Sequence, residues 1–312
     1  MRPITFAVVM SMFFLLAGIG LADEKVTMSE WTEIVQKMGD KGSINWSAGY
    51  IEAVGIGAPP QRAIGTPQAR PMALRAAKMD AYRNLLEITK GVQITSETLV
   101  RDFVVESDVI RSQVEGLVNG AQVVNQDYLS DGTVEVTLRM PIYGDFSRVV
   151  LSKLVVERKP ETVTPAAHRN RTTGETPVLP VTPPAVPQVT AREAPSPATV
   201  VYTGMVVDGR GIQARPAMSP KITDEDSREV YGSMQVDREY AVQQGISGYA
   251  RDLTAAQTNP RVTNNPITVK GLKADGPGRS DIVISNADAA NIRAAADNLS
   301  FMKKCRVMIV LD

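Results

Sequence analysis

Two glycines, Gly55 and Gly57, end an apolar segment and are the first place where residue type and spacing suggest chemistry. A Gly-x-Gly pair after a strand, with Gly65 further on, is part of the pattern that binds the pyrophosphate of a dinucleotide. Such a site needs a helix that starts at the second glycine, because the N–H groups of its first turn hold the phosphate. Here Pro59 and Pro60 intervene before the next helical segment. We therefore favour a glycine-bearing strand end over a nucleotide site.

Three consecutive acidic residues, Asp224, Glu225 and Asp226, are the second candidate. Calcium ions favour several oxygen ligands from one short loop. The run lacks the full set of spaced ligands and the acidic residue that closes a calcium loop. A solvated hairpin tip is the favoured interpretation, and a calcium site is the alternative.

The most reactive side chains are one cysteine, Cys305, and one histidine, His168. Zinc sites need several cysteines or histidines, and a nucleophilic triad needs its histidine inside a folded domain, whereas His168 falls in a proline-rich segment. Cys305 opens a predicted core strand, which favours a buried, inert thiol. A disulfide between two chains is the alternative, since an unpaired cysteine in an oxidising compartment can pair between copies.

Asp80, Arg83 and Glu87 lie three and four residues apart on one predicted helix. Ion pairs at this spacing on a helix surface contribute about 0.3–0.5 kcal/mol each. A pair of catalytic carboxylates is the alternative, but no second group supports it. The sequence therefore predicts no catalytic residue, no cofactor and no metal site, and hence a protein that is not an enzyme.

Two folded parts, residues 28–156 and 199–312, must position these side chains, with a proline-rich linker at 157–198 between them. Nine prolines from Pro160 to Pro197 predict an extended, semi-rigid spacer. A ligand for a proline-recognition module is the alternative. Both folded parts are predicted to be α+β, with helices packed on antiparallel sheets.

The first part contains alternating and helical patterns in a definite order. The predicted elements are a helix at 29–38, a strand at 44–56, a helix at 68–89, an extended segment at 92–100, a helix from 108, hairpin arms at 123–129 and 133–140, and a helix at 145–155. Asp131-Gly132 between two alternating arms is a strong hairpin signal. Val134, Val136, Leu138 and Met140 are expected to share one face of the second arm.

The helix predicted at 68–89 has two apolar faces. One is a stripe of mostly large side chains: Met72, Ala76, Met79, Tyr82, Leu85 and Leu86. We expect this stripe to be buried and the basic side chains of the helix to face water. The other face is small, with Ala73, Ala76, Ala77 and Ala81, and it lets the helix lie close on a sheet.

The second part is predicted from shorter signals. The expected elements are strands at 200–207, 212–222, 230–234, 267–272 and 281–285, a hairpin tip at 224–226, a helix at 286–298, and a last strand at 306–311. A wholly apolar strand such as the last one is typical of the centre of a sheet.

Residues 1–22 have the pattern of a cleavable export signal. Arg2 precedes an apolar run from Ile4 to Leu21, and Gly20 and Ala22 are the small residues that a signal peptidase needs. Cleavage is predicted after Ala22. An uncleaved membrane anchor is the alternative, because the run is about long enough to span a bilayer. No cysteine follows the cut to carry a lipid, so we expect a soluble protein of a bacterial periplasm.

The overall composition excludes several classes of partner. Lysine plus arginine equals aspartate plus glutamate, at 34 each, so no global charge attracts nucleic acid or an anionic membrane. Aromatic residues are 5% of the chain, which argues against stacking platforms for bases. We expect no nucleic-acid partner and only indirect contact with a membrane.

Several segments between residues 44 and 145 resemble the lipoprotein-20-like family of bacterial envelope proteins. In that family a helix with the pattern A-A-x-x-D-A-x-R-x-L-L-E follows a G-x-G strand end, and here the segment Ala73–Glu87 follows Ile51–Gly57. Val114–Ala121 and Asp131–Val136 agree with the family pattern in the same order. The match covers under half of the chain.

The resemblance implies a non-catalytic envelope or scaffold role. The family includes outer-membrane lipoproteins and flagellar basal-body proteins, the flagellar proteins P and T. The chain lacks the lipidated cysteine and is nearer the flagellar T type, with its signal and further domain. The expected partners are envelope or flagellar proteins and copies of the chain itself, with outer-membrane association through them. A periplasmic small-molecule binding protein or a carboxylate-dependent enzyme is the alternative.

Overall fold

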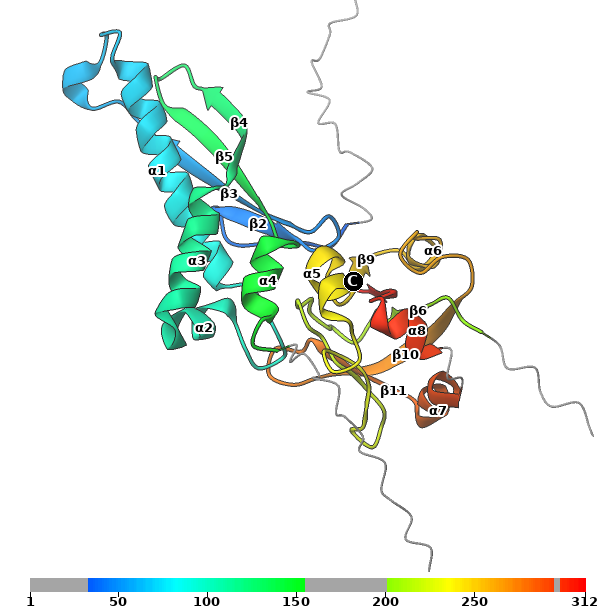
Figure 1. Ribbon diagram of the computed structural model, residues 1–312. Coiled ribbons are helices and arrows are strands. Elements are labelled where there is room, and N and C mark those ends of the chain that lie inside the picture. The colour runs from blue at the N-terminus through cyan, green and yellow to red at the C-terminus, as the bar shows by residue number, and fades with distance from the viewer. Residues whose placement is uncertain (1–32, 155–200, 295–297) are drawn as a thin grey trace, which may run out of the picture.

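The computed structural model describes residues 33–154, 201–294 and 298–312 (Figure 1). The predicted signal at 1–22, the predicted linker at 157–198 and His168 lie outside the described residues. The chain has the α+β fold that the sequence predicts, with helices packed on two sheets. Within the described residues, no helix is both long and apolar enough to cross a bilayer.

The first part is built on an antiparallel sheet of five strands in the order β1-β2-β3-β5-β4. Their bounds are β1 Val35–Lys37, β2 Gly42–Asn45, β3 Tyr50–Gly57, β4 Gln122–Tyr128 and β5 Val134–Pro141. The predicted hairpin is confirmed, because β4 and β5 pair antiparallel around Gly132, whose φ is +86°. The predicted inner face of β5 is confirmed as well: Val134, Val136, Leu138 and Met140 are all buried.

Helices cover one face of this sheet, and a 3₁₀ turn, η2 (Gln61–Ala63), precedes them. Their bounds are α1 Ala69–Lys90, α2 Val100–Glu106, α3 Asp108–Asn119 and α4 Asp145–Leu151. The predictions of α1, α3 and α4 are confirmed. Ser107, just before α3, caps it by accepting a hydrogen bond from the Ile110 N–H.

The structure corrects the predictions for this part at three places. The strand predicted at 44–56 is interrupted by a turn after Asn45, and β3 begins at Tyr50. Val35–Lys37 is strand β1 instead of helix, because its backbone completes a ladder with β2. The extended segment predicted at 92–100 stops at Leu99, because helix α2, which the sequence analysis did not predict, begins at Val100. The Asp102 carboxylate accepts a hydrogen bond from the Leu99 N–H at 2.7 Å and so fixes the helix start. Short apolar runs such as this one cannot be assigned by periodicity alone.

Helix α1 packs on the sheet through its small face. Ala73, Ala77 and Ala81 are fully buried. A Cβ at Gly55 of β3 would lie 2.1 Å from the Ala81 nitrogen, and one at Gly57 would lie 2.3 Å from the Ala73 oxygen. The prediction of close packing is therefore confirmed, and the Gly-x-Gly pair is what allows it.

The prediction that the stripe of large residues on α1 is buried is wrong. Met72 is 37% exposed and Met79 is 62% exposed, whereas Leu85 is fully buried. The first half of the stripe thus faces away from the sheet, whereas Tyr82 and Leu86 in its second half are partly buried against the core. Periodicity identified an apolar face, but the glycines of β3 select the alanine face for burial.

The second part has a mixed sheet of seven strands in the order β8-β7-β11-β10-β6-β12-β9. Their bounds are β6 Gly204–Asp208, β7 Ile222–Thr223, β8 Glu229–Tyr231, β9 Gly248–Ala250, β10 Pro266–Asp275, β11 Asp281–Ile284 and β12 Val307–Val310. The expected antiparallel sheet is wrong here, because β6 pairs parallel with both β10 and β12. Such pairs require crossover connections, and short helices lie between the strands.

Four short helices accompany this sheet: α5 Arg238–Gln244, α6 Leu253–Gln257, α7 Asn286–Ala294 and α8 Asn298–Lys303. Strand β12 lies between β6 and β9, and all four of its residues are buried. The last strand is therefore an interior, fully buried strand, but the prediction that it occupies the centre of a sheet is wrong, because only the edge strand β9 lies beyond it.

The two parts meet directly through a loop of the first part. The Met218 and Ser219 N–H groups donate to the carbonyls of Gln93 at 3.0 Å and Ile94 at 2.7 Å. The Gly278 N–H donates to the Ser96 carbonyl at 2.6 Å. Buried side chains of both parts form one continuous hydrophobic cluster, so the parts share a core.

Candidate functional site

The acidic residues predicted on α1 belong to the packing of the sheet. The Asp80 carboxylate accepts the Ile56 N–H at 3.1 Å, on the edge of β3 that extends beyond β2. Arg83 is 3.8 Å from Asp80, and Glu87 pairs with Lys41 at 2.7 Å. The predicted ion pair within the helix is therefore confirmed for Asp80 and Arg83, whereas Glu87 pairs with Lys41 outside the helix.

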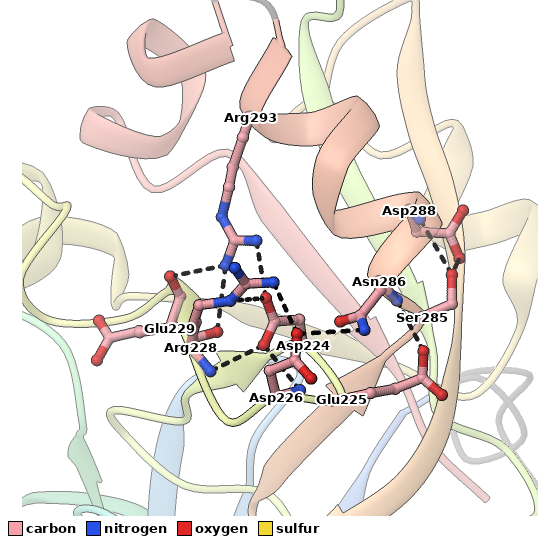
Figure 2. A network of polar contacts seen from close by, with 9 residues as sticks. All are labelled: Asp224, Glu225, Asp226, Arg228, Glu229, Ser285, Asn286, Asp288 and Arg293. Carbon is pink, nitrogen blue, oxygen red and sulfur yellow. Dashed lines mark hydrogen bonds and ion pairs between the residues drawn. The ribbon is translucent and has the colours of Figure 1, made fainter.

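The acidic turn is the centre of a polar network between β7, β8 and α7 (Figure 2). The Asp224 side chain is fully buried. It accepts hydrogen bonds from Arg228 Nε at 2.9 Å and Arg293 Nη1 at 2.8 Å, and from two backbone N–H groups. Burial alone would raise the pKa of Asp224, but the hydrogen bonds from Arg293 and Arg228 lower the pKa to about 2.

The other two acidic residues join this turn to α7. The Glu225 carboxylate accepts the Asn286 N–H at 2.9 Å, and Asp226 binds Arg228 Nη2 at 2.9 Å. The predicted hairpin tip is confirmed, because β7 and β8 pair antiparallel. A fully solvated tip is wrong for Asp224. Within the described part of the chain, no group of three His, Cys, Asp or Glu residues could hold a metal ion.

Cys305 is fully buried in a turn before β12, where its φ is +53°. Burial raises the pKa of the thiol to about 12, so the reactive thiolate is scarce at neutral pH. The prediction of a buried, inert thiol is confirmed. A disulfide between chains would require this turn to open.

Sequence reasoning missed Arg261, which follows α6. Its guanidinium donates to three backbone carbonyls: Nε to Cys305 at 2.8 Å, Nη1 to Gln244 at 2.7 Å and Nη2 to Gly245. These bonds hold the turn before β12 against the loop between α5 and β9. Nothing in the local sequence marks an arginine that binds three carbonyls from distant segments.

A cavity of about 480 Å³ lies beside Arg261, between the two parts. The first part contributes Glu33, Ser47 and Tyr143 to its wall, and the second contributes Tyr249, Asn259 and Arg261, among others. The Ser47 hydroxyl donates to the Tyr249 carbonyl at 2.8 Å across the cavity wall. Sequence reasoning did not place any of these residues in a site.

Two apolar surfaces are exposed on the first part. The first, the edge patch, consists of Val123, Val124, Tyr128 and Leu129, which are 42–49% exposed along β4 and the turn after it. Strand β4 is the last strand of its sheet, so one side of its backbone has no strand partner among the described residues.

The second surface, the helix groove, lies between α1 and α3. Its volume is about 320 Å³. Its apolar wall is formed by Met79, Tyr82, Leu86 and Val118, and its polar wall by Arg83, Glu115 and Asn119. Part of the outward stripe of α1 therefore lines this groove.

Comparison with known proteins gives one match for the second part. Residues 204–312 match a family model described as Treponema pallidum Tp0624, second domain. The match begins at Gly204, the first residue of β6. No curated protein matches the chain at a significant level. The match describes a domain of another protein and names no activity.

Proposed function

We propose that this chain is an exported, non-catalytic scaffold or assembly protein of the bacterial cell envelope, and that it binds other envelope proteins through the edge patch. The observation that carries the proposal is the edge patch itself. An edge strand offers unpaired backbone N–H and C=O groups to another chain, and soluble proteins usually blunt such edges with lysine, proline, a β-bulge or a covering element. Strand β4 contains no lysine and no proline.

The chemistry of the edge patch suits an extended segment of a partner. Backbone pairing along a free edge supplies affinity, and exposed side chains on alternate positions supply specificity. A bulge between Val123 and Asn125 interrupts the ladder near the start of β4. The regular ladder from Asn125 to Tyr128 is therefore the stretch where we expect the partner strand to pair.

The sequence supports the envelope location of this proposal. Residues 1–22 have the pattern of a cleaved export signal, which supports a periplasmic location for the mature chain. The resemblance of residues 44–145 to the lipoprotein-20-like family points to the flagellar basal body, or to another complex linked to the outer membrane, as the assembly. Attachment to the outer membrane would then occur through the bound partners.

The proposal is tested by site-specific photo-crosslinking in living cells. A photoreactive amino acid replaces Val124 in the edge patch, and a control chain carries it at Lys37, an exposed residue of β1 at the opposite edge of the same sheet. We expect Val124 to capture envelope or flagellar proteins that Lys37 does not capture. Equal capture at both positions, or no capture at Val124, would contradict the proposal that the edge patch binds these proteins.

A further inference from the structure

The cavity between the two parts has the size of a small-molecule site. Its volume of about 480 Å³ falls within the range of roughly 300–1,000 Å³ that is usual for ligand pockets. Its wall contains the polar residues Ser47, Tyr143 and Asn259 and the apolar residue Met308. Sites of this kind often lie where two domains meet.

Arg261 brings a positive charge to this wall that no described carboxylate neutralises. The partners of its guanidinium are three neutral backbone carbonyls. Within the described residues, no Asp or Glu lies within ion-pair distance of it. The tyrosines nearby are neutral at physiological pH, because burial raises the pKa of both Tyr143 and Tyr249.

The guanidinium of Arg261 keeps hydrogen-bonding capacity for a ligand. An arginine side chain has five N–H donors, and the three carbonyls engage one on each nitrogen. One N–H on each terminal nitrogen remains. A half-buried cation with free donors attracts an anion, and a carboxylate suits the planar arrangement of these donors.

Glu33 in the same wall restricts which anion fits. Its carboxylate accepts a hydrogen bond from Asn45 at 2.8 Å and forms no ion pair among the described residues, because the nearby Arg251 donates to the Glu33 backbone carbonyl instead, at 3.1 Å. A doubly charged anion such as phosphate would be repelled by it. A ligand that carries an ammonium group beside its carboxylate would satisfy both Glu33 and Arg261.

We propose that the cavity between the two parts binds a small zwitterion, an amino acid or a short peptide, with the ligand carboxylate at Arg261 and its ammonium group at Glu33. This binding site is separate from the edge patch and does not depend on the scaffold function. Because both parts line the cavity, an occupant would hold them together and raise the melting temperature of the chain.

The proposal is tested with the full chain by thermal melting and calorimetric titration against defined probes. The zwitterions are L-alanine, L-glutamate and glycylglycine, and the single-group probes are acetate, methylammonium and inorganic phosphate. We expect a saturable rise in Tm with at least one zwitterion, at concentrations at least tenfold below those needed for acetate, and none with methylammonium. No saturable shift with any zwitterion, or phosphate binding as tightly as the best zwitterion, would overturn the proposal.

Two matched variants on α6 show whether the ligand occupies the cavity. Ala255 is an exposed residue in the cavity wall, and its neighbour Thr254 is exposed but outside the wall. Ala255→Phe should fill the cavity and weaken zwitterion binding at least tenfold, while Thr254→Phe should leave it unchanged. Equal binding by the two variants would place the ligand elsewhere and overturn the proposal.

A variant of Glu33 tests the role of the ammonium group. It leaves Arg261 intact, because removing the three carbonyl bonds of Arg261 would loosen the fold. Glu33→Gln should reduce the preference for zwitterions over acetate to about twofold or less. An unchanged preference would contradict the assignment of Glu33. Crosslinking from Val124 does not depend on this cavity, so failure here would leave the proposed scaffold function to its own test.

Discussion

The two parts of the molecule bring helices against sheets by opposite means. In the first part, α1 contacts β3 through glycine and alanine, and the backbones approach so closely that no side chain fits between them. In the second part, Arg293 of α7 binds the buried Asp224 of the β7–β8 turn, and Arg228 of the same turn binds Asp224 as well. We therefore expect an added side chain to disrupt the contact in the first part, and the loss of the Asp224 charge to disrupt the contact in the second part.

Among the substitutions that compare the two parts, we expect the largest loss of stability at Gly55. Gly55→Val would place atoms within 2.1 Å of the backbone of α1, which cannot move aside as a flexible side chain can. We expect a loss of about 3 kcal/mol or more in the free energy of unfolding, measured by denaturant titration. A loss below about 1 kcal/mol would show that α1 is free to shift and that the close contact with β3 is not needed for stability.

A substitution in the polar network should have the next largest effect. Asp224→Asn keeps the size of the side chain but leaves Arg228 and Arg293 without their shared carboxylate. We expect a lower Tm by calorimetry than for the wild type. Asp226→Asn in the same turn is the matched control, because Asp226 is 59% exposed and should lower the Tm less. The reverse order of the two variants would contradict the central role of Asp224.

Acid should weaken the second part through its carboxylates. Hydrogen bonds from Arg210 lower the pKa of Asp208 to about 2, and the pKa of Asp224 is also about 2, against a usual value of 3.8. A lowered pKa in the folded state gives stability that is present above about pH 4 and is lost between about pH 4 and 2. Asp281 acts in the opposite sense, because burial raises its pKa.

This acid dependence is measured by thermal melts from pH 5 to pH 2. We expect Tm to fall most steeply below about pH 4, and the fall to be shallower in Asp224→Asn, which lacks one of the titrating groups. The same slope in both proteins would mean that other carboxylates dominate the acid response.

The smallest expected effect is a gain in stability at Gly116. This glycine lies inside α3, and a Cβ there would meet nothing within 4 Å. Gly116→Ala should therefore stabilise the protein by about 0.4–1 kcal/mol, because it restricts the unfolded chain and favours the helix. A loss of stability in the same denaturant titration would show that Gly116 is required for a reason other than close contact with a neighbouring element.

Local signals in the sequence predicted those elements that local residues determine. Asp131-Gly132 marked the β4–β5 hairpin, and alternation marked its buried face. The length and alanine content of 69–90 marked α1. In each case the decisive residues lie within the element itself.

Distant contacts decided what the sequence could not predict. The buried face of α1 was chosen by Gly55 and Gly57 on another element, and β1 became a strand through its ladder with β2. The cavity between the parts was missed for the same reason. Glu33 and Arg261 are far apart in the sequence, and only the packing of the two parts places them in one wall.

Strand β12 is the last strand of the second sheet to be synthesised, and it therefore determines when that sheet can form. Its four residues pair with β6 on one side and β9 on the other, and β6 lies about a hundred residues earlier in the chain. The second sheet therefore cannot close until residues 307–310 have left the ribosome, whereas all strands of the first sheet precede residue 142. A late closing strand keeps the second part of the chain open while it is being made, which would suit the export that we propose for this protein.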